Sequence, residues 1–118
     1  MVKRGLKPTA GIFGKRLREA RLAAGLTQDA LGVAIGLDEG PACIRISRYE
    51  SGVHSPRLEV LWQLAEALEI PPAFLVTEDD RLAQAMVRLH HLTKVDPQGV
   101  ADMLGRWSEK LESLARDR

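Results

Sequence analysis

The chain has 118 residues, a net charge of +1 and only 4% aromatic residues, so its core must consist mainly of aliphatic side chains. Because leucine and alanine favour helices, the expected architecture is an all-α domain, with or without a small appendage. Residues 1–57 contain 10 Lys/Arg and 5 Asp/Glu, whereas residues 58–118 contain 7 and 11, an asymmetry that a nucleic-acid-binding half would produce and that chance clustering explains equally well. One cysteine excludes an intrachain disulfide, and no apolar run is long enough to span a membrane.

The first part of the chain is expected to form a flexible basic tail, residues 1–11, followed by a domain of short helices over residues 12–76. Phe13 and Leu17 begin a stripe with helical spacing. Thr27 is a suitable N-cap for the second helix, because its hydroxyl can accept a hydrogen bond from an unpaired amide of the first turn. The expected helices span residues 12–24, 28–35, 42–51, 56–68 and 73–76.

The fourth helix and the last two helices have start signals of their own. Ser55 is expected to cap the fourth helix, with Pro56 in the first helical position, where a missing N–H does no harm. Thr77 is expected to cap a helix over residues 78–92, and Asp96–Pro97 to begin the final helix. Both of these last helices are amphipathic, so each needs a partner surface.

Two segments in the N-terminal half carry a motif. Residues 17–36 have the sequence LREARLAAGLTQDALGVAIG, and residues 46–75 have the sequence ISRYESGVHSPRLEVLWQLAEALEIPPAFL. In this order they resemble the Xre/Cro-type helix-turn-helix family. The resemblance implies a five-helix, lambda-repressor-like DNA-binding domain over residues 12–76. This chain departs from the family in a longer connection between the second and third helices, around Leu37–Pro41.

The resemblance implies that the helix over residues 42–51 enters the major groove of DNA. Ile46 and Tyr49 would form its inner face, leaving the opposite face for base edges. Arg45 and Arg48 are three residues apart and can bond guanine bidentately, which makes them the best candidates for sequence recognition. The candidate base contacts are Cys43, Ile44, Arg45, Ser47 and Arg48.

Other residues match family positions that contact the DNA backbone or support the recognition helix. Gln28 matches a glutamine that bonds a phosphate and braces the third helix, at a helix N-terminus whose amides also attract anions. Glu50 matches a glutamate that pairs with an arginine, here Arg21, in a structural salt bridge, because a carboxylate facing phosphate would be repelled. The candidate phosphate contacts are Lys15, Thr27, Gln28, Ser51, His54 and Arg57.

The final helix carries the signal for self-association. A twofold dimer would give its apolar stripe a copy of itself and would place two recognition helices about 34 Å apart, as two DNA half-sites require. We therefore predict a homodimer with residues 77–118 as the dimerisation segment, while docking of this segment on its own domain is the alternative. The candidate interface residues are Val100, Met103, Leu104, Trp107 and Leu111, and Leu114 continues the stripe.

The residue pattern favours a regulator over an enzyme. His90 and His91 point to different sides of a helix, and one cysteine gives no metal cluster, so no metal, cofactor or catalytic site is expected. The expected function is transcriptional repression by a cytoplasmic protein that binds double-stranded DNA. An antitoxin whose C-terminal helices bind a toxin is the alternative, although two stable amphipathic helices favour self-association. A redox role for Cys43 stays open beside that of a small outward residue.

Overall fold

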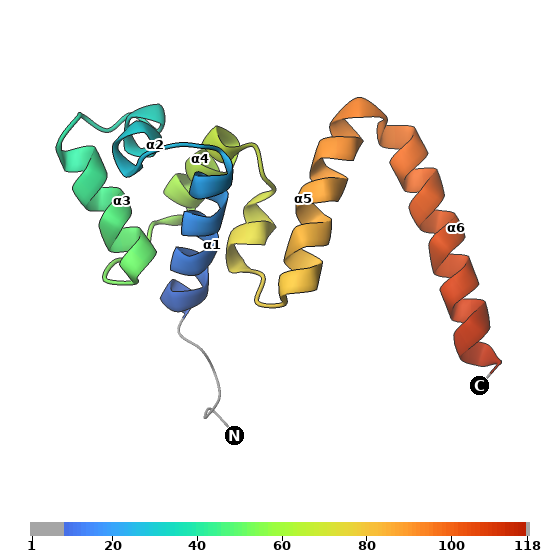
Figure 1. Cartoon of the computed structure of the whole chain (residues 1–118). Helices are drawn as coiled ribbons and strands as arrows, with labels where there is room; N and C mark the ends of the chain where they lie inside the picture. The colour runs from blue at the N-terminus through green and yellow to red at the C-terminus, as the bar shows by residue number, and fades with distance from the viewer. Residues whose placement is uncertain (1–8, 118) are drawn as a thin grey trace, which may run out of the picture.

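The computed structural model describes residues 9–117, which form helices and the loops that join them, with no strand in this range (Figure 1). The first four α-helices and a 3₁₀ helix, η1, make up an N-terminal body, and two longer helices follow. The predicted fold class, an all-α protein with a five-helix domain and two further helices, is confirmed. The helices are α1 (Thr9–Ala23), α2 (Gln28–Ala34), α3 (Pro41–Ser51), α4 (Leu58–Leu68), η1 (Pro72–Val76), α5 (Asp80–Val95) and α6 (Pro97–Arg116).

The start of α1 lies earlier than predicted. The helix begins at Thr9 rather than Ile12, so residues 9–11 belong to it and not to the predicted flexible tail. No residue between Pro8 and Ile12 prevents a helix, since Ala10 favours one and a single glycine costs only about 1 kcal/mol. The rest of the predicted tail, including its three basic residues, lies outside the described residues.

The start of α4 corrects the prediction that Ser55 caps this helix with Pro56 in its first turn. The N-cap is Arg57, whose φ of −68° and ψ of 160° are extended. The preceding segment stays outside a helix because it has to lead the chain away from α3, and the amide of His54 bonds the carbonyl of Arg48 at 3.2 Å. Only after Arg57 does the backbone turn into α4.

The start of α5 also lies later than predicted. Asp79, not Thr77, is the N-cap, and its carboxylate accepts a hydrogen bond from the amide of Leu82 at 2.9 Å. The hydroxyl of Thr77 instead donates to a carbonyl of η1 at 2.6 Å, so it serves the end of the preceding helix. Thr27 caps α2 and Asp96 caps α6, as predicted.

The body encloses one apolar core, to which α5 contributes Ala83. Phe13 and Leu17 are buried as their spacing predicts, whereas two large apolar side chains of α4 lie outside the core, with Leu58 64% and Trp62 56% exposed. The buried core consists of Phe13, Leu17, Ala20, Leu31, Ile46, Tyr49, Leu64, Ala65, Leu68, Ile70, Phe74, Leu75 and Ala83.

Two helical glycines allow close packing around α3. A Cβ atom at Gly14 in α1 would overlap the carbonyl oxygen of Glu50, and one at Gly32 in α2 would lie 2.5 Å from the Cβ of Ala42. Neither neighbour is the end of a flexible side chain that could move aside. These glycines therefore set how closely α1 and α2 approach α3 and hold it at a defined tilt.

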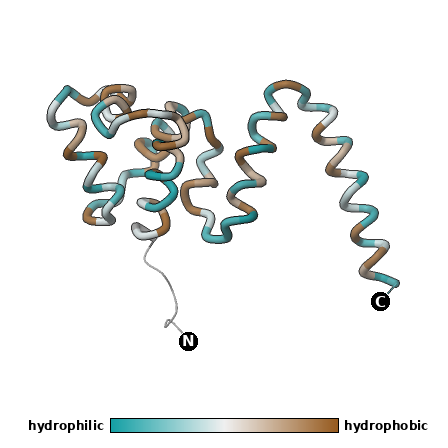
Figure 2. The backbone as a smooth tube through the Cα atoms, in the orientation of Figure 1, coloured by the Kyte–Doolittle hydropathy of each residue, from teal (hydrophilic) through white to brown (hydrophobic). Residues whose placement is uncertain are grey.

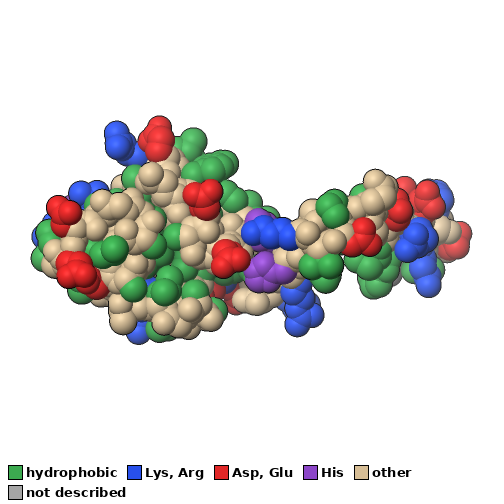
Figure 3. All heavy atoms as spheres, turned by 90° about the horizontal axis from the view of Figure 1, so that it is seen from above, with side chains coloured by type: hydrophobic (Ala, Val, Ile, Leu, Met, Phe, Trp, Pro, Cys, Tyr) green, Lys and Arg blue, Asp and Glu red, His purple; other side chains and the backbone are tan. Residues whose placement is uncertain are grey.

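Helices α5 and α6 form a hairpin that extends from the body (Figure 1). The Cα radius of gyration is 17.3 Å, larger than the value of about 13.5 Å expected for a compact chain of this length. None of the α6 side chains described is buried, and hydrophobic positions recur along it (Figure 2). Viewed from above, α6 projects from the rounded body with apolar side chains on its surface (Figure 3). No helix among the described residues is long and apolar enough to cross a membrane.

Candidate DNA-binding surface

Helix α3 lies at the edge of the body with one face buried and the other in solvent. Ala42 and Ile46 are fully buried, and the ring of Tyr49 meets Phe13 edge to face, with 6.2 Å between ring centroids. The opposite face carries the exposed side chains Cys43, Ile44, Arg45, Ser47 and Arg48. The structure thus places all the candidate base contacts on the solvent side of one helix.

A cationic groove of about 400 Å³ lies at the C-terminal end of α3. The Nη1 atom of Arg45 lies 3.4 Å from the hydroxyl of Tyr49. The Nε atom of Arg57 lies 4.0 Å from the Glu59 carboxylate, a weak pair because both side chains are largely exposed. Among the described residues, no acidic side chain lines the groove, so it suits an anion such as a phosphate oxygen. Its lining residues are Arg45, Arg48, Tyr49, His54, Ser55, Arg57 and Val60.

The structure brings Arg21 of α1 and Glu50 of α3 together in a bidentate ion pair. Arg21 donates through Nε to Oε2 of Glu50 at 2.6 Å and through Nη2 to Oε1 at 3.1 Å. The two side chains are 9% and 5% exposed, and Arg21 also donates to the carbonyl of Leu26 at 2.9 Å. The bond to Glu50 raises the pKa of Arg21, although burial works against this rise. The pair therefore links α3 to α1 behind the exposed face.

Gln28, the first residue of α2, extends this link to the start of α3. Its amide nitrogen donates to Oε1 of Glu50 at 3.1 Å, and its amide oxygen lies 3.5 Å from the thiol sulfur of Cys43. Since a primary amide has two N–H donors, one remains to be directed elsewhere. The bracing contact that the resemblance implied for Gln28 is therefore present in the geometry.

The remaining candidate phosphate contacts do not all lie together. The hydroxyl of Thr27 accepts from the amide of Ala30 at 3.0 Å as the α2 N-cap, and Ser51 donates to the Arg48 carbonyl at 3.2 Å. Lys15 is placed apart from this surface, with its ammonium 3.4 Å from a carboxylate oxygen of Asp80 at the start of α5.

Sequence reasoning missed Arg16, which is more deeply buried than Arg21. It is only 1% exposed, and its guanidinium lies over the ring of Phe74 with 5.6 Å to the centroid. The signal was present, because Arg16 stands three residues after Phe13 and four before Ala20, on the same helix face. Its charge concealed this, since arginine is rarely fully buried.

Comparisons with known proteins bear on this arrangement. A family model described as helix-turn-helix matches residues 17–75. The chain belongs to the Xre/Cro-type helix-turn-helix family. Among solved structures, it is similar to the crystal structure of transcriptional regulator BswR, with 34% sequence identity, a TM-score of 0.72, and coverage of 79% of this chain and 92% of that chain. A comparison with curated protein sequences gave no match. Family membership and this neighbour support a DNA-binding regulator.

Proposed function

We propose that this helix-turn-helix protein is a sequence-specific transcriptional regulator that reads operator DNA with α3 in the major groove. The observation that carries the proposal is the exposed face of α3, with Arg45 and Arg48, beside a groove to which the described part of the chain contributes cationic side chains and no acidic one. A helix fits the major groove, and arginine can bond O6 and N7 of guanine together. The groove would lie against phosphates, which position the protein without reading sequence.

The other exposed residues of this surface extend the proposal. Cys43 and Ile44 could contact thymine methyl groups, while Ser51 and the N-terminus of α2 would approach phosphates. Gln28 would hold α3 through Glu50 and would donate its second N–H to a phosphate. These contacts divide the surface into residues that read bases and residues that set position.

We further propose that the protein acts as a homodimer joined through α6. Leu104, Trp107 and Leu111 are 44%, 66% and 57% exposed, and an apolar stripe of this length marks an interaction surface. Because α6 extends away from the body (Figure 1), the stripe is available to a second copy. Val100 and Met103 would complete the interface. A dimer bound at a promoter would repress by excluding polymerase from the same DNA.

DNA binding is tested with genomic fragments that co-purify with the full-length protein and are identified by sequencing. The logarithm of affinity for these fragments should fall linearly with the logarithm of salt concentration, with a slope that corresponds to roughly four to eight phosphate contacts per dimer. Affinity that does not change with salt would contradict a nucleic-acid role.

The dimer is tested by sedimentation of the full chain and of two variants that each add one negative charge to α6. Trp107→Glu should dissociate the dimer and weaken operator binding while the body stays folded. Ser113→Glu is the matched control, because this exposed residue lies about 120° around the helix from Trp107, and it should remain dimeric. A monomeric wild-type chain at tens of micromolar would refute the dimer and favour the antitoxin alternative.

A further inference from the structure

We propose that Arg16 is a positioning residue that sets the direction of α5 and α6 relative to the recognition helix. Through this direction it sets which spacing of two DNA half-sites the dimer accepts. This inference rests on the proposed function as a dimeric DNA reader. It concerns the segment of residues 77–80, called the joint below, through which the chain passes from the body into α5.

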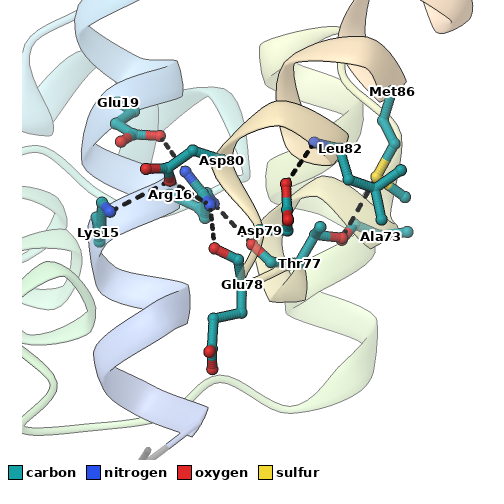
Figure 4. A network of polar contacts seen from close by, with 10 residues as sticks. All are labelled: Lys15, Arg16, Glu19, Ala73, Thr77, Glu78, Asp79, Asp80, Leu82 and Met86. Atoms are coloured by element: carbon teal, nitrogen blue, oxygen red, sulfur yellow. Dashed lines mark hydrogen bonds and ion pairs between the residues drawn. The ribbon is translucent and has the colours of Figure 1, made fainter.

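The guanidinium of Arg16 binds three residues of the joint (Figure 4). Nε donates to the carbonyl of Thr77 at 2.8 Å, and Nη2 donates both to the carbonyl of Glu78 and to Oδ1 of Asp80 at 2.8 Å each. On the other side, Nη1 donates to Oε1 of Glu19 at 3.0 Å. A rigid planar fork with donors in several directions thus holds the joint against α1.

These bonds matter because the other contacts between α5 and the body are mostly apolar. Ala83 is the α5 side chain that the structure shows as fully buried, Val87 packs partly buried against the same core, and the sulfur of Met86 lies 3.3 Å from the hydroxyl of Thr77; apolar contacts of this kind are less directional than hydrogen bonds. At the far end, a ring nitrogen of His91 lies 3.0 Å from the carbonyl of Glu69, but His91 is exposed. The polar contacts at the joint therefore fix where and in which direction α5 begins, and the apolar contacts of Ala83 and Val87 act beside them.

The length of α5 converts a small change at the joint into a large displacement. With 16 residues, α5 is about 24 Å long. A rotation of about 10° at its start would move the far end by about 4 Å, close to the 3.4 Å between successive base pairs. Since α6 continues from that end and would carry the dimer contact, loosening the joint should blur the distance between the two α3 helices by about one base pair.

The test compares full-length wild type with Arg16→Met, which keeps an unbranched apolar stem but removes the guanidinium donors. Arg18→Met is the matched control, since Arg18 is exposed on the same helix. Wild-type protein first selects duplexes from a random-sequence library. The selected paired site is then remade as a single half-site and as a series with base pairs inserted or removed between the halves.

Arg16→Met should remain a dimer by sedimentation and bind the single half-site as wild type does. On the selected paired site it should lose about tenfold in affinity, because the second half-site is no longer held at the right distance, and its preference for one spacing should broaden. Arg18→Met should keep the wild-type spacing profile. An unchanged profile in Arg16→Met, or an equal loss on single and paired sites, would overturn the inference.

A second variant covers the case in which Arg16→Met does not fold. Asp80→Asn removes the charge of one Arg16 partner at a side chain that is 70% exposed, and it should broaden the spacing profile in the same direction by a smaller factor. An unchanged profile in this folded variant would also overturn the inference. By contrast, a wild-type chain that is monomeric or selects no paired sites would refute the proposed function itself.

Discussion

Replacing Glu50 with alanine should destabilise the body in the absence of DNA, because it leaves Arg21 buried without its carboxylate. Breaking a buried ion pair by removing one partner costs about 3–5 kcal/mol. Arg21 keeps its bond to the carbonyl of Leu26, so we expect the lower end, about 3 kcal/mol. A domain of this size shifts its melting temperature by about 4–8 °C per kcal/mol, which gives a fall of about 12 °C or more.

The assay is thermal unfolding of the full chain followed by circular dichroism at one fixed protein concentration, since a dimer's melting temperature depends on concentration. The matched control is the double variant Arg21→Met/Glu50→Met, in which neither charge is left alone and much of the loss should be recovered. A melting temperature within about 2 °C of wild type for Glu50→Ala, together with lost operator binding, would show that Glu50 acts on DNA and not on the fold.

Three further predictions concern recognition, packing and pH. Arg48→Ala should weaken binding to the operator by about 1–3 kcal/mol and binding to random DNA by much less. Gln28→Ala should weaken binding to the operator and to random DNA alike. If competition titrations show that each variant loses as much affinity for random DNA as for the operator, α3 is wrongly placed. Gly32→Ala should lower stability in chemical unfolding by about 1–3 kcal/mol because it overpacks the contact with α3, while Gly105→Ala, with nothing within 4 Å of its added methyl group, should not. Burial, with help from Lys94 and His91, lowers the pKa of His90 below its ordinary 6.5. The folded state therefore binds fewer protons than the unfolded state, and the free energy of unfolding should fall as pH drops through 6.5. This fall should be smaller in His90→Asn; the same fall in wild type and variant would show that His90 does not contribute.

Features with local causes could be predicted from the sequence. Thr27 caps α2 because a hydroxyl before a helix meets the unpaired amides of its first turn whatever the rest of the fold does. Gly52 has a φ of 83° at the end of α3, a conformation that glycine adopts without steric cost. The buried face of α3 likewise followed from helical periodicity, and the Arg21–Glu50 contact followed from the family resemblance.

Features that depend on a distant partner could not be predicted. Gly14 and Gly32 indicate weak helix positions in the sequence, and only the packed structure shows that Glu50 and Ala42 lie against them. The Ser55–Pro56 signal for a helix start is sound locally, but the chain at that point must first leave the end of α3. Arg16 lies on the apolar face of α1, but a charged side chain can be buried there only if it finds hydrogen-bond acceptors. The carbonyl acceptors belong to a segment more than 60 positions away in the sequence.

Helix α3 is held at its ends and from behind, and its outward side chains take little part in holding it. Gly40 and Gly52 cap its two ends with φ angles of 92° and 83°. Its inner residues and Glu50 make the contacts to the body. Substitutions at exposed positions away from such contacts usually change stability by less than about 0.5 kcal/mol. The outward side chains can therefore differ between related genes, or be exchanged by design, without loss of the fold. One scaffold can in this way yield regulators with different operators. The outward side chains are Cys43, Ile44, Arg45, Ser47 and Arg48.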